Sequence, residues 1–315
     1  WGGRNLLKLG RELPDDEPVA ESWEIAAHKD GMSVVLNGTY AGRTLQQLLD
    51  LMGEDFIGKN NLWALERGLF PLMVKIIDAE KRLSVQVHPD DEYAKIHEGN
   101  EFGKTEMWVV LDAKPGTEIV YGFAQKTSKE LFQKAIETSS VEKYLNQIPI
   151  KTGDHICVPS GTMHAILDGS LIVEIQQNSN TTYRVYDWGR KDDKGNARQL
   201  HVDKAMDVIN FDQVKPGLTE STIIKKTNQL TQEVLCSNQY FVTERITCLE
   251  EYVYKGICDG STMEIWGLIS GRADIDENPV ANIQFFVLPA KMGEFSIHAY
   301  PGAVLLRVYT ARSNH

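Results

Sequence analysis

Long apolar runs are absent from this sequence of 315 residues. No stretch approaches the roughly 20 apolar residues that a helix needs to cross a bilayer, so we expect no membrane contact. The opening "WGGRNLLKLG" has neither an initiator Met nor a signal-peptide pattern, and we expect a few residues to precede it. The cysteines contain no CxxC pair. These features predict a cytoplasmic protein.

Positively charged residues are also fewer than negatively charged ones. Lys and Arg number 33 against 44 Asp and Glu, which gives a formal net charge of −11. No Lys/Arg run compensates for this excess, so we expect no nucleic-acid partner. An anionic small substrate would need a dedicated cationic pocket. The GxGxxG, Walker and GxSxG motifs are missing as well, which argues against the nucleotide-binding and hydrolase classes that carry them.

Short strand-like runs separated by turn residues make up most of the chain. They include "LFPLMVKIID", "TEMWVVLDA", "TEIVYGF", "DHICVPSG", "SLIVEIQQ" and "TTYRVYDWG", and beyond residue 260 "EIWGLISGRADI", "FFVLPAKMGEFSI" and "GAVLLRVYT". This pattern predicts an all-β dominated sandwich or barrel rather than βαβ units.

Helical signals are few. "TLQQLLDLMG" predicts a helix that ends at Gly53, and "HVDKAMDVIN" indicates another. Two capping-box patterns, Thr127…Glu130 and Ser139…Glu142, predict a small helical insertion over residues 126–149. The polar segment 210–221 marks a domain boundary near residue 215, so we expect a catalytic domain over 1–215 and a second β-domain over 216–315.

The stretch "LSVQVHPDD" at 83–91 alternates apolar and polar residues. On a strand, Ser84, Gln86 and His88 then share one face. If that face meets solvent, the strand is an ordinary half-buried one. If it lines a barrel, it is the start of a site.

A second chemical pattern lies in "GDHICVPSGTMHAI", where Gly153, Pro159, Gly161 and His164 have the spacing G-x5-P-x-G-x2-H. The spacing resembles the second signature of the cupin superfamily, whose barrels hold a metal inside. The alternative is a buried core histidine that follows a hairpin. Imidazoles of His88 and His164 with the carboxylate of Glu106 suit a borderline cation such as Zn²⁺.

Four motifs in order, "SVQVHPDD", "GKTEMW", "PSGTMHAI" and "EIQQNSNTTYRVYDWGR", resemble those of type I phosphomannose isomerases. "WGG", "ESWEIAAH" and "SVVLNG" resemble the short bacterial branch of that family. The resemblance covers nearly all of residues 1–215. It implies tandem cupin domains, the second without metal ligands. It also implies a zinc-dependent interconversion of mannose 6-phosphate and fructose 6-phosphate through an enediolate.

The resemblance also assigns roles to residues. It implies one zinc ion held by Gln86, His88, Glu106 and His164, and contacts to the sugar phosphate from Ser84, Lys104 and Arg184, with Arg190 at the rim. The expected catalytic residues are Arg184, Glu174 and Lys104.

Glu174 lies two residues from Gln176 on one strand and is the expected proton-transfer base. Lys104, Asp187 and a metal-bound water are the alternatives. Less specific interpretations stay open: Arg184 as half of a barrel-wall ion pair, Lys104 as a solvated loop lysine, and Glu174 as a residue that orients its neighbours.

Two other functions compete with the isomerase. A cupin oxygenase using Fe²⁺ is disfavoured because the first strand offers Gln-x-His instead of the usual two-His carboxylate set. A sugar-binding module without catalysis is disfavoured by the complete set of candidate ligands. The natural metal could be Mn²⁺ or Co²⁺ in place of zinc, and a monomer fits the sequence without being required by it.

Overall fold

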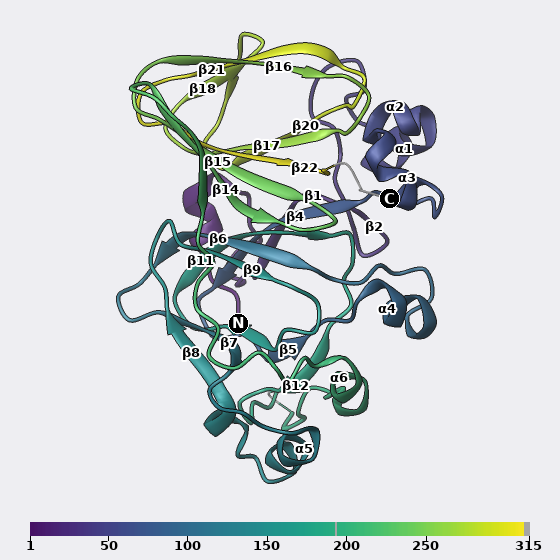
Figure 1. Cartoon of the computed structure of the whole chain (residues 1–315), viewed down its shortest axis with the longest axis vertical. Helices are drawn as coiled ribbons and strands as arrows, with labels where there is room; N and C mark the ends of the chain where they lie inside the picture. The colour runs from purple at the N-terminus through teal and green to yellow at the C-terminus, as the bar shows by residue number, and fades with distance from the viewer. Residues whose placement is uncertain (193, 312–315) are drawn as a thin grey trace. The chain divides into compact units, whose positions relative to one another are not determined.

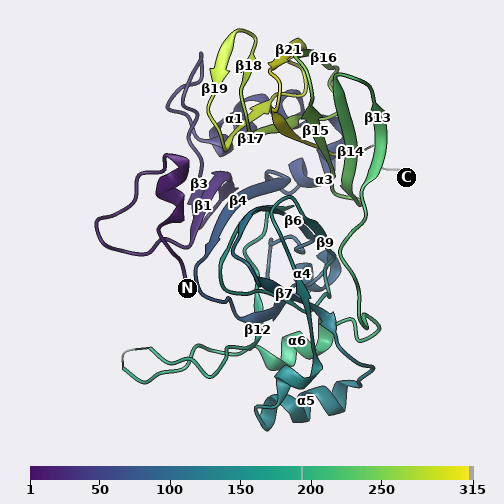
Figure 2. The same ribbon diagram turned by 90° about the vertical axis from the view of Figure 1, so that its left-hand side faces the viewer.

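The computed structural model describes residues 1–192 and 194–311. Within them lie twenty-two strands, six α-helices and three 3₁₀ turns (Figures 1 and 2), which confirms the predicted β-dominated fold. The chain forms two compact units, one of residues 1–22 with 76–218 and the other of residues 23–75 with the chain from Thr219 onward. One boundary between the units lies after Leu218, and the expected domains over 1–215 and 216–315 stay a prediction. Residues 23–75, however, group with the later strands.

Unit 1 contains two five-stranded sheets whose spatial order departs from chain order, as in the predicted cupin barrel. The first has the order β1 (Glu21–Ile25), β4 (Leu72–Ala79), β11 (Ser170–Gln177), β6 (Glu106–Ala113) and β9 (His155–Val158). The second has the order β12 (Tyr183–Tyr186), β5 (Val85–Val87), β10 (His164–Ile166), β7 (Glu118–Phe123) and β8 (Leu145–Pro149). The chain crosses between the units within β1 and β4.

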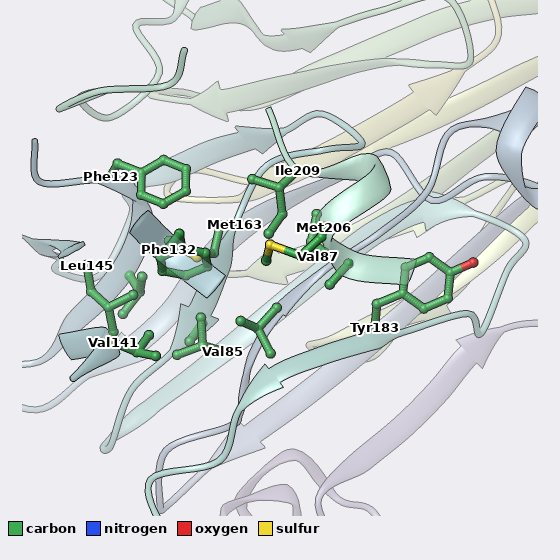
Figure 3. Close-up of a cluster of buried hydrophobic side chains, with 14 of the residues drawn as sticks. Val85, Val87, Phe123, Phe132, Val141, Leu145, Met163, Tyr183, Met206 and Ile209 are labelled. Atoms are coloured by element: carbon green, nitrogen blue, oxygen red, sulfur yellow. The ribbon is translucent and has the colours of Figure 1, made fainter. Parts of the chain in front are cut away.

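Helices cover the outer face of the second sheet. They are α5 (Lys129–Glu137) and α6 (Val202–Val208), with the 3₁₀ turn η3 (Val141–Tyr144), while α4 (Asp91–His97) follows β5 (Figure 1). Val85 and Val87 pack into one buried cluster with Phe132 of α5 and Met206 of α6 (Figure 3). Burying a valine side chain contributes about 1.5–3 kcal/mol. This packing turns the intervening Gln86 to the inner face.

The helical insertion is smaller than predicted. Ser128, not Thr127, caps α5 by accepting a hydrogen bond from Leu131 N at 3.3 Å. Ser139 has a positive φ of 52°, so the second predicted helix reduces to η3. Residues 145–149 form β8, which pairs with β7. The two other predicted helices are present as α1 (Leu45–Met52), which ends at Gly53, and α6.

Unit 2 is built on a six-stranded and a four-stranded sheet. The larger has the order β13 (Thr222–Lys226), β14 (Leu230–Ser237), β15 (Val242–Cys248), β22 (Val304–Tyr309), β17 (Glu264–Ser270) and β20 (Gln284–Leu288). The smaller has the order β16 (Tyr252–Cys258), β21 (Gly293–Ala299), β18 (Ala273–Ile275) and β19 (Asn278–Val280). Between them lies a buried core that includes Trp266, Phe295 and Leu305.

The earlier segment of unit 2 carries the hairpin β2 (Ala27–His28) and β3 (Gly31–Met32) and the helices α1, α2 (Glu54–Ile57) and α3 (Leu62–Leu65). Backbone hydrogen bonds tie it to the later strands: Ala290 N donates to Phe56 O at 2.8 Å and Met263 N to Ile57 O at 3.1 Å. These contacts explain why residues 23–75 belong to unit 2. In the described residues, no helix has the length and apolar character to span a bilayer.

A buried ionic cluster occupies the interior of unit 2. Arg307 donates to both carboxylate oxygens of Glu264 and, at 3.4 Å, to Glu244. Tyr309 and Trp266 donate to the same carboxylates at 2.9 and 2.8 Å. Burial opposes the charge of Arg307, but Glu264 and Glu244 outweigh it and raise the pKa of the guanidinium.

We expect Arg307→Leu to destabilise the protein by about 3–5 kcal/mol, because it leaves two buried carboxylates without their cation. Urea denaturation followed by tryptophan fluorescence measures the change. Lys291→Leu is the control, since Lys291 pairs with Asp55 with both side chains about half exposed; its loss should cost about 0–1 kcal/mol. Equal losses in the two variants would contradict a structural role for the Arg307 cluster.

Candidate functional site

Three of the predicted metal ligands meet inside unit 1. His88 directly follows β5, Glu106 begins β6 and His164 begins β10. One ligand atom from each lies within 4.8 Å of the others, and all three side chains are buried. Among the described residues this is the only group of three or more His, Cys, Asp or Glu with such geometry.

Strand register explains the convergence. His164 on β10 lies directly opposite Gln86 on β5, and Arg184 on β12 lies opposite the same Gln86. On the facing sheet, Gln176 of β11 lies opposite Glu106 of β6. Side chains at paired positions project to the same face of a sheet. Gln86, Glu106 and His164 therefore project into the barrel.

Glu106 lies between the two imidazoles. Its Oε2 is 3.5 Å from His88 Nε2 and its Oε1 is 3.3 Å from His164 Nε2. Gln86 contributes its amide nitrogen, 3.4 Å from His164 Nε2. The structure thus brings the four predicted ligands together, but the amide oxygen of Gln86 must turn toward the cluster before it can bind a cation.

Backbone carbonyls fix the Nδ1 proton of both histidines. His88 Nδ1 is 2.8 Å from the carbonyl of Thr181, and His164 Nδ1 is 2.8 Å from that of Thr162. Because a carbonyl only accepts hydrogen bonds, each Nδ1 carries the proton. Burial lowers the pKa of His164 to about 4, so its ring is neutral near pH 7. The Nε2 lone pair of His164 then faces Glu106, as in metal-binding histidines.

Lys104 balances the buried carboxylates. Its ammonium lies 2.8 Å from Glu106 Oε2, 3.5 Å from Glu174 Oε1 and 3.4 Å from His88 Nε2. Burial opposes its charge, but Glu106 and Glu174 outweigh burial and raise the pKa of Lys104. The side chain is buried, so the interpretation of Lys104 as a solvated loop lysine is wrong.

Glu174 lies on the same interior face, opposite Trp108 in the register of β11 and β6. The indole N–H of Trp108 donates to Glu174 Oε2 at 3.1 Å. One carboxylate oxygen is therefore fixed by Trp108, and the other faces Lys104. The Trp108 ring also packs edge-on against His164.

The donor set fits a divalent cation. Within the described residues, the buried Glu106 Oε1 accepts no hydrogen bond, although a buried carboxylate oxygen without a partner is costly. The Nε2 of the neutral His164 ring lies 3.3 Å from it. A cation bound by His88, Glu106 and His164, with Gln86 as a further ligand, would satisfy that oxygen.

Arg184 and Ser84 lie together at the other end of the same row of side chains. Arg184 Nε donates to Ser84 Oγ at 3.2 Å, and its Nη1 donates to the carbonyl of Gln199 at 2.9 Å. Burial, with the positive charges of Arg198 and Arg190, lowers the pKa of Arg184. No carboxylate of residues 1–192 and 194–311 forms an ion pair with Arg184, so the ion-pair interpretation is wrong.

Arg190 lies apart from that pair. It donates to Asp187 and to the carbonyl of Arg82, and none of its hydrogen bonds reaches Ser84 or Arg184. Asp187, an alternative proton-transfer base, also accepts from Arg198. Burial opposes ionisation of Asp187, but the two arginines lower the pKa of its carboxyl.

Sequence reasoning missed three kinds of contributor. The carbonyls of Thr181 and Thr162 carry no side-chain signal. The contact from Trp108 to Glu174 depends on pairing between strands about sixty residues apart in sequence. Trp108 alternates with Glu106, so its interior position could have been inferred. The pairing of Arg198 with Asp187 depends on a loop whose course the sequence does not specify.

Comparisons with known proteins identify the relatives of this chain. Residues 1–117 match the family model described as phosphomannose isomerase type I, catalytic domain. Over 312 residues the chain is 39% identical to a probable mannose-6-phosphate isomerase, GmuF, of Bacillus subtilis (strain 168), covering 94% of this chain and 92% of that one. It is 48% identical over 212 residues to a mannose-6-phosphate isomerase of Streptococcus mutans, covering 67% and 64% of the two chains.

The fold agrees with these matches. A crystal structure of the mannose 6-phosphate isomerase from Bacillus subtilis superposes with a TM-score of 0.86 at 34% identity, covering 98% of this chain and 95% of that one. Sequence and structure together place the chain in one family: it belongs to the type I phosphomannose isomerases.

Proposed function

We propose that the chain is an aldose–ketose isomerase that interconverts mannose 6-phosphate and fructose 6-phosphate. The observation that carries the proposal is the buried His88, Glu106 and His164 cluster on the same interior face as the Arg184–Ser84 pair. The first group suits a cation that binds sugar oxygens, and the second suits a phosphate. The names of the relatives support the same reaction. A location in the cytoplasm stays a prediction.

Zinc, one per chain, is the proposed cofactor, with Gln86, His88, Glu106 and His164 as its ligands. Imidazole, carboxylate and amide oxygen donors suit zinc, and Mn²⁺ or Co²⁺ can use the same set. When bound, such a cation supplies Lewis acidity toward a sugar oxygen. The chain supplies the remaining functions, which are binding the phosphate, compensating charge and moving the proton.

The isomerisation transfers a proton between C1 and C2 through an enediolate. Arg184 and Ser84 would bind the phosphate and so fix the position of the reacting carbons. Lys104, whose ammonium lies in the barrel interior between Glu106 and Glu174, would donate toward the oxygen on which negative charge develops. The sugar would thus be held at both ends.

Glu174 is the proposed proton-transfer base. Its carboxylate is buried, and Trp108 fixes Oε2. Oε1 lies 3.5 Å from the ammonium of Lys104, on the side of the metal-ligand cluster. Asp187 and Lys104 are less well placed, because two arginines donate to Asp187 and the neighbouring carboxylates favour the charged form of Lys104. A metal-bound water stays an alternative.

Purified protein should convert mannose 6-phosphate to fructose 6-phosphate, and chelation should abolish the conversion until metal is restored. A coupled assay measures the product, and elemental analysis identifies the ion. Oxygen consumption would indicate the oxygenase alternative instead. Chelator-insensitive conversion would contradict the metal site, and no conversion by the metal-loaded protein would favour the sugar-binding module.

His164→Ala should lower metal content well below one ion per chain and remove activity with it, because one of the two imidazole donors is lost. His97→Ala is the matched control, since His97 is exposed on α4, stacks on Tyr93 and is not one of the clustered residues. Circular dichroism checks that both variants fold. Full activity in a metal-free His164→Ala protein would refute the site.

Arg184→Ala should raise KM for mannose 6-phosphate and leave metal content unchanged. Losing a charged phosphate contact commonly costs about 1.5–3 kcal/mol, which is roughly a 10- to 150-fold change. Steady-state kinetics and elemental analysis of the same preparation measure both. Loss of metal together with affinity would make Arg184 structural rather than a substrate contact.

A further inference from the structure

Arg198 of unit 1 shares its carboxylate partner, Asp187, with a second arginine. It lies in the loop between β12 and α6, which Figure 2 shows as an extended segment. Its Nε donates to Asp187 Oδ2 at 2.8 Å and its Nη2 to Asp187 Oδ1 at 2.5 Å. Arg190 donates to the same Oδ1. Asp187 is buried and its single charge serves two arginines.

The backbone around Arg198 is tied to Arg184. The carbonyl of Gln199, the next residue, accepts from Arg184 Nη1 at 2.9 Å. His201 and Arg184 exchange two further bonds, His201 N to Arg184 O at 2.8 Å and Arg184 N to His201 Nδ1 at 3.2 Å. These three bonds hold the loop that carries Arg198 beside the β12 position of Arg184.

The turn that carries Asp187 is fixed from the other side. Trp188 has a positive φ of 58°, which is unusual for a bulky residue. Its indole N–H donates to the carbonyl of Leu83 at 2.6 Å, next to Ser84. A backbone held in this conformation requires support from its surroundings. Asp187, Arg198 and Arg184 are therefore anchored to the strand end that bears Ser84.

The charges of this cluster do not cancel. Arg184, Arg190 and Arg198 bring three positive charges against one from Asp187, in a chain whose formal charge is −11. Burial lowers the pKa of Arg184, and the positive charges of Arg198 and Arg190 lower it further, while Asp187 raises it. A dianion bound among the arginines would relieve the repulsion between them.

Hydrogen-bond donors are available for such an anion. In the part of the chain that the structure describes, Arg184 Nη2 and Arg198 Nη1 make no hydrogen bond. Ser84 Oγ accepts from Arg184 and keeps its own proton to donate. Guanidinium and hydroxyl donors of this kind match the oxygens of a phosphate.

We propose that Arg198 is a substrate-binding residue, which completes a phosphate site with Arg184 and Ser84, and that Asp187 is the positioning residue that holds its guanidinium. This inference rests on the proposed function for the identity of the substrate. The competing interpretation is that Arg198 serves only to pair with Asp187 and stabilise the loop.

The test compares Arg198→Gln with Arg82→Gln. Both remove one exposed arginine that is paired with one carboxylate, and the side chains of Arg198 and Arg82 are 41% and 44% exposed. Arg82 pairs with Asp168 instead of Asp187. Isothermal titration with inorganic phosphate measures anion binding without turnover. Kinetics with mannose 6-phosphate and with unphosphorylated mannose separate phosphate contacts from the chemistry.

Arg198→Gln should weaken phosphate binding and raise KM for mannose 6-phosphate about 10- to 100-fold, with kcat for mannose 6-phosphate and kcat/KM for mannose little changed. Arg82→Gln should leave all of these near wild type. Equal losses in both variants would mean that only net charge matters and would overturn the proposal. Unchanged phosphate affinity in Arg198→Gln would overturn it as well.

Arg198→Lys covers the case in which Arg198→Gln does not fold, since it keeps the charge but loses the planar fork. We expect intermediate phosphate affinity. Asp187→Asn tests positioning. It makes the cluster more positive, yet phosphate should bind more weakly because Arg198 is no longer held, with kcat at saturation preserved. Tighter phosphate binding would show that Asp187 only competes with the anion.

The two proposals can fail separately. If the wild-type protein isomerises mannose 6-phosphate but phosphate binding ignores Arg198, this inference falls and the isomerase function stands. If the wild-type protein shows no isomerisation while phosphate binding still depends on Arg198, the phosphate site stands and the function falls.

Discussion

The charge of Glu106 is the constraint on which unit 1 depends. Its carboxylate has no exposed surface, and an ionised carboxylate in such a place is tolerated only with compensation. Lys104 supplies one cation at 2.8 Å. His164 supplies no charge near pH 7, because burial lowers its pKa to about 4. The site is therefore partly compensated by the chain, and one oxygen is left for a cation to satisfy.

That constraint dictates how the strands around it are built. β5 must bury one face against α5 and α6 and present polar groups on the other. Val85 and Val87 meet the first requirement and Gln86 the second. A shift of one residue in register would exchange the faces and move the amide out of the barrel. The outer hydrophobic cluster (Figure 3) is thus what holds the inner polar row in place.

The local sequence pattern was enough to predict much of this arrangement. Alternation in 83–88 placed Gln86 and His88 on one face, and the spacing around Gly161 placed His164 after a hairpin. The family resemblance added the ligand set. What local pattern could not supply were contacts between distant segments. These are the return of residues 23–75 to unit 2, the buried ammonium of Lys104 and the pairing of Arg198 with Asp187. Each depends on tertiary contacts that leave no periodic pattern in the local sequence. The second capping box failed because Ser139 adopts a positive φ, and only the folded chain shows that.

Both units have buried carboxylates in their interiors, but the hydrogen bonding of these carboxylates differs. In unit 2 every oxygen of Glu244 and Glu264 accepts a hydrogen bond, from Gln232, Tyr309, Trp266 or Arg307. Such a closed network stabilises its core and has no acceptor left for a ligand. In unit 1, Glu106 Oε1 lacks a donor within the described residues and faces a neutral imidazole. A buried carboxylate oxygen without a donor costs stability. The open acceptor, 3.3 Å from the Nε2 of His164, is therefore the feature that indicates chemistry in unit 1.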